Sequence, residues 1–107
     1  MHWKAYRRRV RIEILYAADC PNLPVARSRV HEALRAARVH AVVEEFEVGS
    51  LEEAERLGLR GSPTIKVDGV DPFAGGGEVS ISCRLYRSEG RPRGSPSVDD
   101  LVAVLSP

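Results

Sequence analysis

Hydrophobic and polar residues alternate along the first part of this chain, and the period then changes. Between Val10 and Tyr16 every second residue is apolar, and toward the end of this stretch both sides become apolar. Such a pattern predicts a strand that starts near the edge of a sheet and runs into its middle. From about Asn22 to Val39 the apolar residues recur at helical spacing, with arginines on the other positions. With a second strand over Ala41–Val48, the chain opens as a β-α-β unit of parallel strands.

Two further helices are marked by their first residues. Ser50 with Glu53 three places later is a capping box, which predicts a helix over residues 51–57. Ser97 stands in the same position before the apolar stripe of a last helix, Val98–Leu105.

The remaining strands are short. Thr64–Val67 is a predicted third strand, and Asp68-Gly69 is a turn signal after it. The clean alternation over Val79–Tyr86 predicts a fourth strand. Residues 70–78 and 87–96 are rich in Gly, Pro and polar residues and are predicted loops.

Composition and charge narrow the function classes. The chain has 107 residues, 43% of them hydrophobic, and a net charge of +1, which indicates one folded domain without the basic excess of a nucleic-acid-binding protein. We therefore expect a basic N-terminal arm over residues 1–9 and a single domain over residues 10–107. Charged residues interrupt the first apolar stretch, and no run approaches the ~20 apolar residues of a membrane helix. The expectation is a cytoplasmic protein without a membrane partner.

Cys20 is the residue whose position most clearly suggests chemical reactivity. It follows the first predicted strand and stands where the first predicted helix begins. The first N–H groups of a helix lack partners and carry the positive end of its dipole, which favours a thiolate placed there. A proline, Pro63, precedes the third predicted strand.

The element order β-α-β-α-β-β-α, with Cys20 after the first strand and Ser62-Pro63-Thr64 before the third, resembles the thioredoxin and glutaredoxin superfamily. The resemblance implies a three-layer α/β fold with a mixed four-stranded sheet of order 2-1-3-4, in which the third and fourth strands form an antiparallel hairpin. It also implies a cis Ser62–Pro63 bond whose loop lies against the active cysteine.

More narrowly, four short motifs are similar to small bacterial thioredoxin-family proteins, some of which are labelled as related to alkylmercury lyase. The motifs are Cys-Pro-Asn at residues 20–22, Arg-Gly-Ser-Pro-Thr at 60–64, Asp-Pro-Phe at 71–73 and Ser-Cys-Arg-Leu-Tyr at 82–86.

One departure from the superfamily limits the chemistry. The second cysteine of the Cys-x-x-Cys motif is replaced by Leu23, so no local thiol can resolve a mixed disulfide. The resemblance then implies a monothiol type of thiol–disulfide oxidoreductase, with no cofactor or metal and with an external resolving thiol, glutathione-like or from a protein. Cys20 would be its catalytic thiol. The residues expected to shape the binding site are Pro21, Asn22, Ser62, Pro63 and Thr64.

Two alternatives stay open. The fold could serve as a non-catalytic binding module, with Cys20 holding a soft metal such as mercury, because thiolates prefer soft metals. It could also be a structural or partner-binding domain, with residues 80–84 as an edge strand that pairs with a second copy in a homodimer.

Cys83 is the second cysteine, and two interpretations compete for it. The alternation places it on one face with Val79, Ile81 and Leu85, which predicts a core thiol, since free cysteine is among the most buried residue types. The alternative is a second thiol that acts with Cys20 as resolving thiol or metal ligand. We expect the two to be too far apart for a disulfide, because a fourth strand would lie at the sheet edge.

Overall fold

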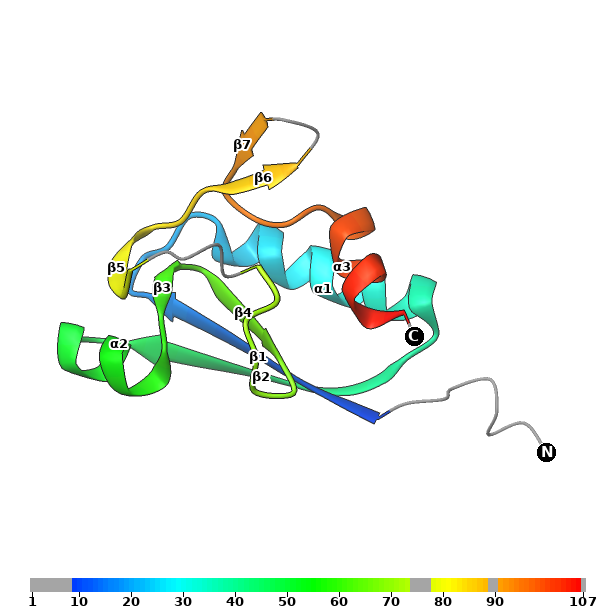
Figure 1. The fold of residues 1–107 in the computed structure, drawn as a ribbon, viewed down its shortest axis with the longest axis horizontal. Helices are drawn as coiled ribbons and strands as arrows, with labels where there is room; N and C mark the ends of the chain where they lie inside the picture. Colours follow the sequence, from blue (N-terminus) through cyan, green and yellow to red (C-terminus); the bar gives the residue numbers. More distant parts are fainter. Residues whose placement is uncertain (1–8, 74–77, 89–90, 107) are drawn as a thin grey trace.

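The computed structural model describes residues 9–73, 78–88 and 91–106, which form an α/β fold with three helices (Figure 1). The predicted N-terminal arm lies outside the described residues except for Arg9. Along the chain the elements are β1 (Arg9–Ala17), α1 (Leu23–Ala37), β2 (His40–Val48), α2 (Leu51–Leu57), β3 (Arg60–Ser62), β4 (Thr64–Val67), β5 (Ser80–Cys83), β6 (Tyr86–Ser88), β7 (Arg91–Arg93) and α3 (Val98–Leu105).

The central sheet has three strands in the order β2-β1-β4. β1 lies in the middle and pairs parallel with β2 and antiparallel with β4, so that Ile14 stands between Glu45 and Ile65. This confirms the prediction that β1 runs into the middle of a sheet. Because β4 is antiparallel to β1, the start of β4 lies beside the end of β1, where the Cys20 segment begins.

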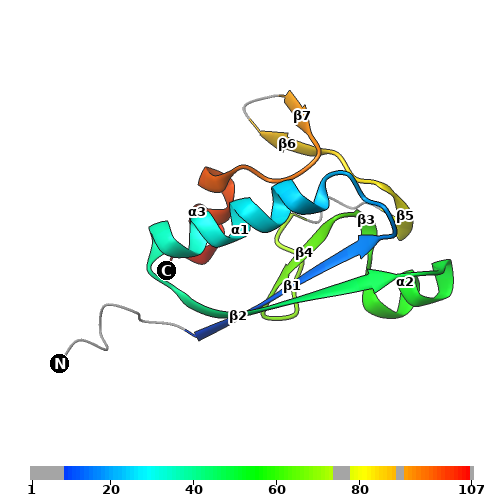
Figure 2. The same cartoon turned by 180° about the vertical axis from the view of Figure 1, so that it is seen from behind.

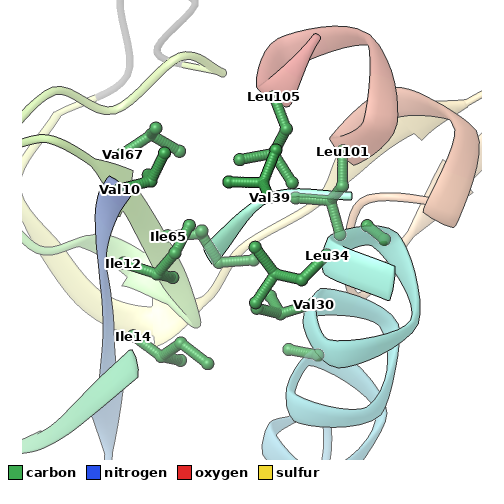
Figure 3. Packing of buried hydrophobic residues seen from close by; sticks show 12 residues of the cluster. Val10, Ile12, Ile14, Val30, Leu34, Val39, Ile65, Val67, Leu101 and Leu105 are labelled. Atoms are coloured by element: carbon green, nitrogen blue, oxygen red, sulfur yellow. The ribbon is translucent and has the colours of Figure 1, made fainter. Parts of the chain in front are cut away.

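The larger hydrophobic core fills the space between this sheet and the pair of helices α1 and α3 (Figure 3). Alternate residues of β1 and β4 point toward the two helices, as the period of a strand requires. The buried members of this core are Val10, Ile12, Ile14, Ala26, Val30, Ala33, Leu34, Val39, Ile65, Val67, Leu101 and Leu105.

α2 lies at one end of the sheet, on the side away from α1 (Figure 2). A smaller hydrophobic core packs there. Leu15 directly follows Ile14 on β1 and therefore points to the other face, where it packs with Val48, Ala54 and Leu59. Both faces of the sheet are thus covered near the end of β1, which explains why the pattern becomes apolar on both sides there.

The helix boundaries follow the capping signals. Ser50 Oγ accepts a hydrogen bond from Glu53 N at 3.1 Å, and Ser97 Oγ accepts one from Asp100 N at 3.0 Å. Both predicted helix starts are confirmed. Side-chain oxygens at these positions satisfy N–H groups that have no partner within the helix.

The predicted fourth strand differs most from the structure. The chain over Val79–Tyr86 is broken at Arg84, and its first part, β5, pairs parallel with β3 in a separate two-stranded sheet rather than forming a hairpin with β4. The order 2-1-3-4 is therefore represented only by its first three strands. The alternation along Val79–Tyr86 identified extended backbone, but the strand partner depends on where the preceding loop directs the chain.

The predicted loop over residues 87–96 also needs correction. Its first part belongs to a β-hairpin of β6 and β7, in which Tyr86 stands opposite Arg93 and Arg87 opposite Pro92. The abundance of Gly and Pro concealed these short strands. Among the described residues, no helix is long and apolar enough to cross a membrane.

Candidate functional site

Cys20 lies in the turn between β1 and α1. Its N–H donates to Ala17 O at 3.2 Å, and its carbonyl accepts from Leu23 N at 3.3 Å. Asp19 adopts the left-handed conformation with φ of 59°, which reverses the chain just before the cysteine. Because α1 begins at Leu23 after its N-cap residue Asn22, Cys20 stands in the turn before the helix rather than in its first turn. It is partly exposed.

The Ser62–Pro63 bond is cis, as predicted. The register of β4 on β1, with Thr64 opposite Leu15, places this bond beside the end of β1. There the Ser62 hydroxyl accepts a hydrogen bond from Ala17 N at 2.9 Å. Ala17 therefore connects the two predicted parts of the site, since its carbonyl accepts from Cys20 N and its N–H donates to Ser62.

Thr64 stabilises the turn around Pro63 through hydrogen bonds of its side chain to the backbone of the same turn. Its hydroxyl accepts from Arg60 N at 3.0 Å and donates to Gly61 O at 2.6 Å. The side chains of Ser62, Pro63 and Thr64 are all fully buried. The contribution of these three side chains to the site is therefore to set the shape of the Pro63 loop, whereas Cys20 and Pro21 are more exposed.

A second segment, Arg84–Tyr86, holds the same loop from the other side. Arg84 N donates to Ser62 O at 3.0 Å, and the Tyr86 hydroxyl donates to Pro63 O. The carbonyls of Ser62 and Pro63, on either side of Pro63, thus both have partners in this segment.

Arg84 forms a buried ion pair that the sequence pattern did not predict. Its Nη1 lies 2.5 Å from Asp71 Oδ2, and the two side chains are only 9% and 7% exposed. Its Nη2 donates to Phe73 O at 2.7 Å. The guanidinium carbon lies 4.5 Å from the centre of the Tyr86 ring, a cation–π distance.

Aromatic packing completes this cluster. The Phe73 and Tyr86 rings meet edge to face with centroids 5.7 Å apart, and Phe73 packs against the larger core. Phe73 therefore adds a partly buried aromatic ring to the larger core. One signal along the chain could have pointed to the cluster, an Asp-Pro-Phe motif that begins 13 residues before Arg84, but nothing in the spacing says that the two segments meet.

Burial raises the pKa of the Tyr86 phenol above its ordinary value. Arg84 opposes this effect, while the negative charge of Asp71 raises the pKa further. Tyr86 is therefore a neutral hydrogen-bond donor at physiological pH.

Asn22 joins the start of α1 to the end of β7. A Cβ atom on Gly94 would lie 2.5 Å from the amide atoms of Asn22, so the Asn22 side chain rests directly on the Gly94 backbone. A side chain at position 94 would therefore have to displace the Asn22 amide. The β6–β7 hairpin consequently stands next to the turn that carries Cys20 (Figure 1).

Cys83 is exposed, so the prediction of a core thiol is wrong. It stands opposite Ser62 in the pairing of β3 with β5, and its apolar neighbours Ile81 and Leu85 are 46% and 71% exposed. The supposed core face of this stretch is turned to solvent from Ile81 onward, and only Val79 packs partly against the smaller core. Cys20 and Cys83 are both free. Within residues 9–73, 78–88 and 91–106, no three His, Cys, Asp or Glu side chains are grouped closely enough to hold a metal.

Gly61 is expected to be intolerant of a side chain. Its φ is +92°, and a Cβ there would lie 2.7 Å from Arg84 Cβ. Gly61→Ala should lower the free energy of unfolding by about 2–3 kcal/mol, because it combines backbone strain with a steric clash. Urea unfolding followed by circular dichroism would measure the loss.

Gly69→Ala is the matched control for this substitution. Gly69 has a similar φ of +85°, but a Cβ added there would meet no atom within 4 Å, so only the backbone cost of about 1 kcal/mol is expected. Equal losses in the two variants would show that contact with Arg84 is not what excludes a side chain at Gly61.

Comparisons with protein-family models, with curated proteins and with solved structures found no match to this chain.

Proposed function

We propose that this protein is a thioredoxin-like thiol protein that carries out monothiol thiol–disulfide exchange through Cys20. The observation that supports this most directly is the connection of a partly exposed cysteine to a cis-proline loop. Cys20 N bonds to Ala17 O, and Ala17 N bonds to the hydroxyl of Ser62, the residue before Pro63.

The proposal includes membership of the thioredoxin-like superfamily. Its support is the strand order β2-β1-β4, the Cys20 turn after the central strand and the cis proline before β4. The order β2-β1-β4 corresponds to the first three strands of the order 2-1-3-4 that the resemblance implies. The strand expected in fourth place, β5, pairs with β3 instead.

The exchange proceeds in two displacements. The Cys20 thiolate attacks one sulfur of a substrate disulfide, a new sulfur–sulfur bond forms, and the other substrate sulfur leaves as a thiolate that takes up a proton. An external thiolate then attacks the substrate sulfur of this mixed disulfide and releases Cys20 as thiolate. Leu23 stands where a local resolving thiol would be, so the external thiol is required for turnover.

The reactivity of the two cysteines tests the proposal. At pH 7, Cys83→Ser should react with the neutral disulfide dithiodipyridine about ten-fold faster than free cysteine does, whereas Cys20→Ser should react no faster than free cysteine. Intact-mass analysis should find one mixed disulfide on Cys20 that glutathione removes. A Cys20 rate equal to that of free cysteine, or a mixed disulfide confined to Cys83, would contradict the proposal.

A further inference from the structure

The segment that holds the Pro63 loop comes from the part of the chain whose alternation predicts an edge strand. Arg84 N and the Tyr86 hydroxyl bond to the carbonyls of Ser62 and Pro63. Tyr86 is 4% exposed, the Arg84 guanidinium lies over its ring, and the Phe73 ring meets it edge to face. A buried phenol with these contacts has little rotational freedom.

The hydrogen bonds form one connected path from the cysteine to this segment. Cys20 N donates a hydrogen bond to Ala17 O, and Ala17 N donates one to the Ser62 hydroxyl. Arg84 N donates one to Ser62 O. The path ends on the buried pair of Arg84 with Asp71, in which Arg84 also holds the Phe73 carbonyl. Networks of buried hydrogen bonds keep their members in one arrangement because any displacement leaves several polar groups without partners.

We propose that Tyr86 is a positioning residue of the Cys20 site: its hydroxyl holds the Pro63 carbonyl, and the buried pair of Arg84 and Asp71 holds Tyr86. This inference rests on the proposed function. Tyr86 acts through the Pro63 loop, which the hydrogen bond from Ala17 N to the Ser62 hydroxyl connects to the turn that carries Cys20. An approaching disulfide must be aligned with the Cys20 sulfur, so the rate of exchange depends on how this turn is held. A small alkylating agent needs only the thiol and does not depend on the loop.

This difference defines the experiment, which uses the full chain with Cys83→Ser so that only Cys20 reacts. Tyr86→Phe keeps the ring and removes the hydrogen bond. It should lower the rate of exchange with dithiodipyridine about ten-fold, since small displacements of positioned groups have large kinetic effects, and leave the rate of alkylation by iodoacetamide unchanged.

Ile12→Val provides the matched control. Ile12 is a buried member of the larger core, paired with Val67 at the far end of β4 from Pro63, and this truncation should lower the melting temperature without touching the Pro63 loop. It should leave both rates unchanged. If Tyr86→Phe proves unfolded by circular dichroism, Asp71→Asn is the second variant, because it weakens the hold on Arg84 while keeping the side-chain shape. It should reduce exchange selectively in the same way.

The outcomes separate the two hypotheses. If Cys83→Ser alone fails to exchange faster than free cysteine, the proposed function fails and this inference falls with it. If it exchanges fast and Tyr86→Phe exchanges equally fast, the proposed function stands and the positioning role is refuted. An equal loss of exchange and alkylation in Tyr86→Phe would also refute it, since that result means general damage to the Cys20 turn.

Discussion

Leu23→Cys is expected to convert the protein from a monothiol into a dithiol type of exchange protein. Leu23 is the first residue of α1, and its N–H bonds to the Cys20 carbonyl, so the two side chains leave the same turn. A thiol there would attack the mixed disulfide on Cys20 without an external partner. Because intramolecular attack has a high effective concentration, substrate release should be at least ~100-fold faster than with a millimolar external thiol.

The measurement follows the mixed disulfide by intact mass after a stoichiometric dose of dithiodipyridine. In the Cys83→Ser background, Leu23→Cys should lose the adduct spontaneously and finish two hydrogens lighter, as a disulfide between residues 20 and 23. The control carries Cys20→Ser in addition to Leu23→Cys and Cys83→Ser. Its single thiol, at position 23, should form an adduct and keep it. Since Leu23 packs partly against the larger core, a stability loss of about 1–2 kcal/mol is also expected.

A stable adduct on Leu23→Cys would show that the turn does not bring the two sulfurs into reach. A disulfide requires Cα atoms within about 7 Å and suitable Cβ directions. That result would count against the thioredoxin-like geometry of this turn, which is part of the proposed function.

Arg84→Met is expected to cause the largest loss of stability, about 3–5 kcal/mol, because it leaves the buried Asp71 carboxylate without its partner. Methionine keeps much of the apolar stem but supplies no donor for Asp71 or for the Phe73 carbonyl. Urea unfolding at pH 7 measures the change. A second substitution, Asp71→Leu in the same chain, should restore part of the loss by removing the unpaired charge.

Arg27→Met is the matched control. Arg27 pairs with Glu45 through a bond of 2.6 Å from Nε, but their side chains are 45% and 27% exposed. Solvent screens such pairs, so no measurable change in stability is expected. The Arg27 hydrogen bond holds the pKa of Glu45 below its ordinary value, so whatever this pair contributes is present above about pH 4.3 and is lost as the pH falls further. A loss as large as that of Arg84→Met would show that burial does not decide the cost.

The sequence alone determined the elements whose signals are local. The strand that ends before Cys20, the helices capped by Ser50 and Ser97, and the short strand after Pro63 all occur as predicted. Their signals are caps, turns and hydrophobic periods, which act between residues a few positions apart.

The tertiary structure alone decided which distant segments meet. The pairing of β5 with β3, the exposure of Cys83 and the burial of Arg84 beside Asp71 have no signature in the sequence, because alternation marks extended backbone without naming its partner. In a hydrophobic–polar pattern, an arginine is counted as polar whether it lies in solvent or beside a buried carboxylate. The residues near Cys20 along the chain were therefore predictable from the sequence. The segment Arg84–Tyr86, which holds the Pro63 loop, was not predictable, because long-range contacts depend on how every intervening loop directs the backbone.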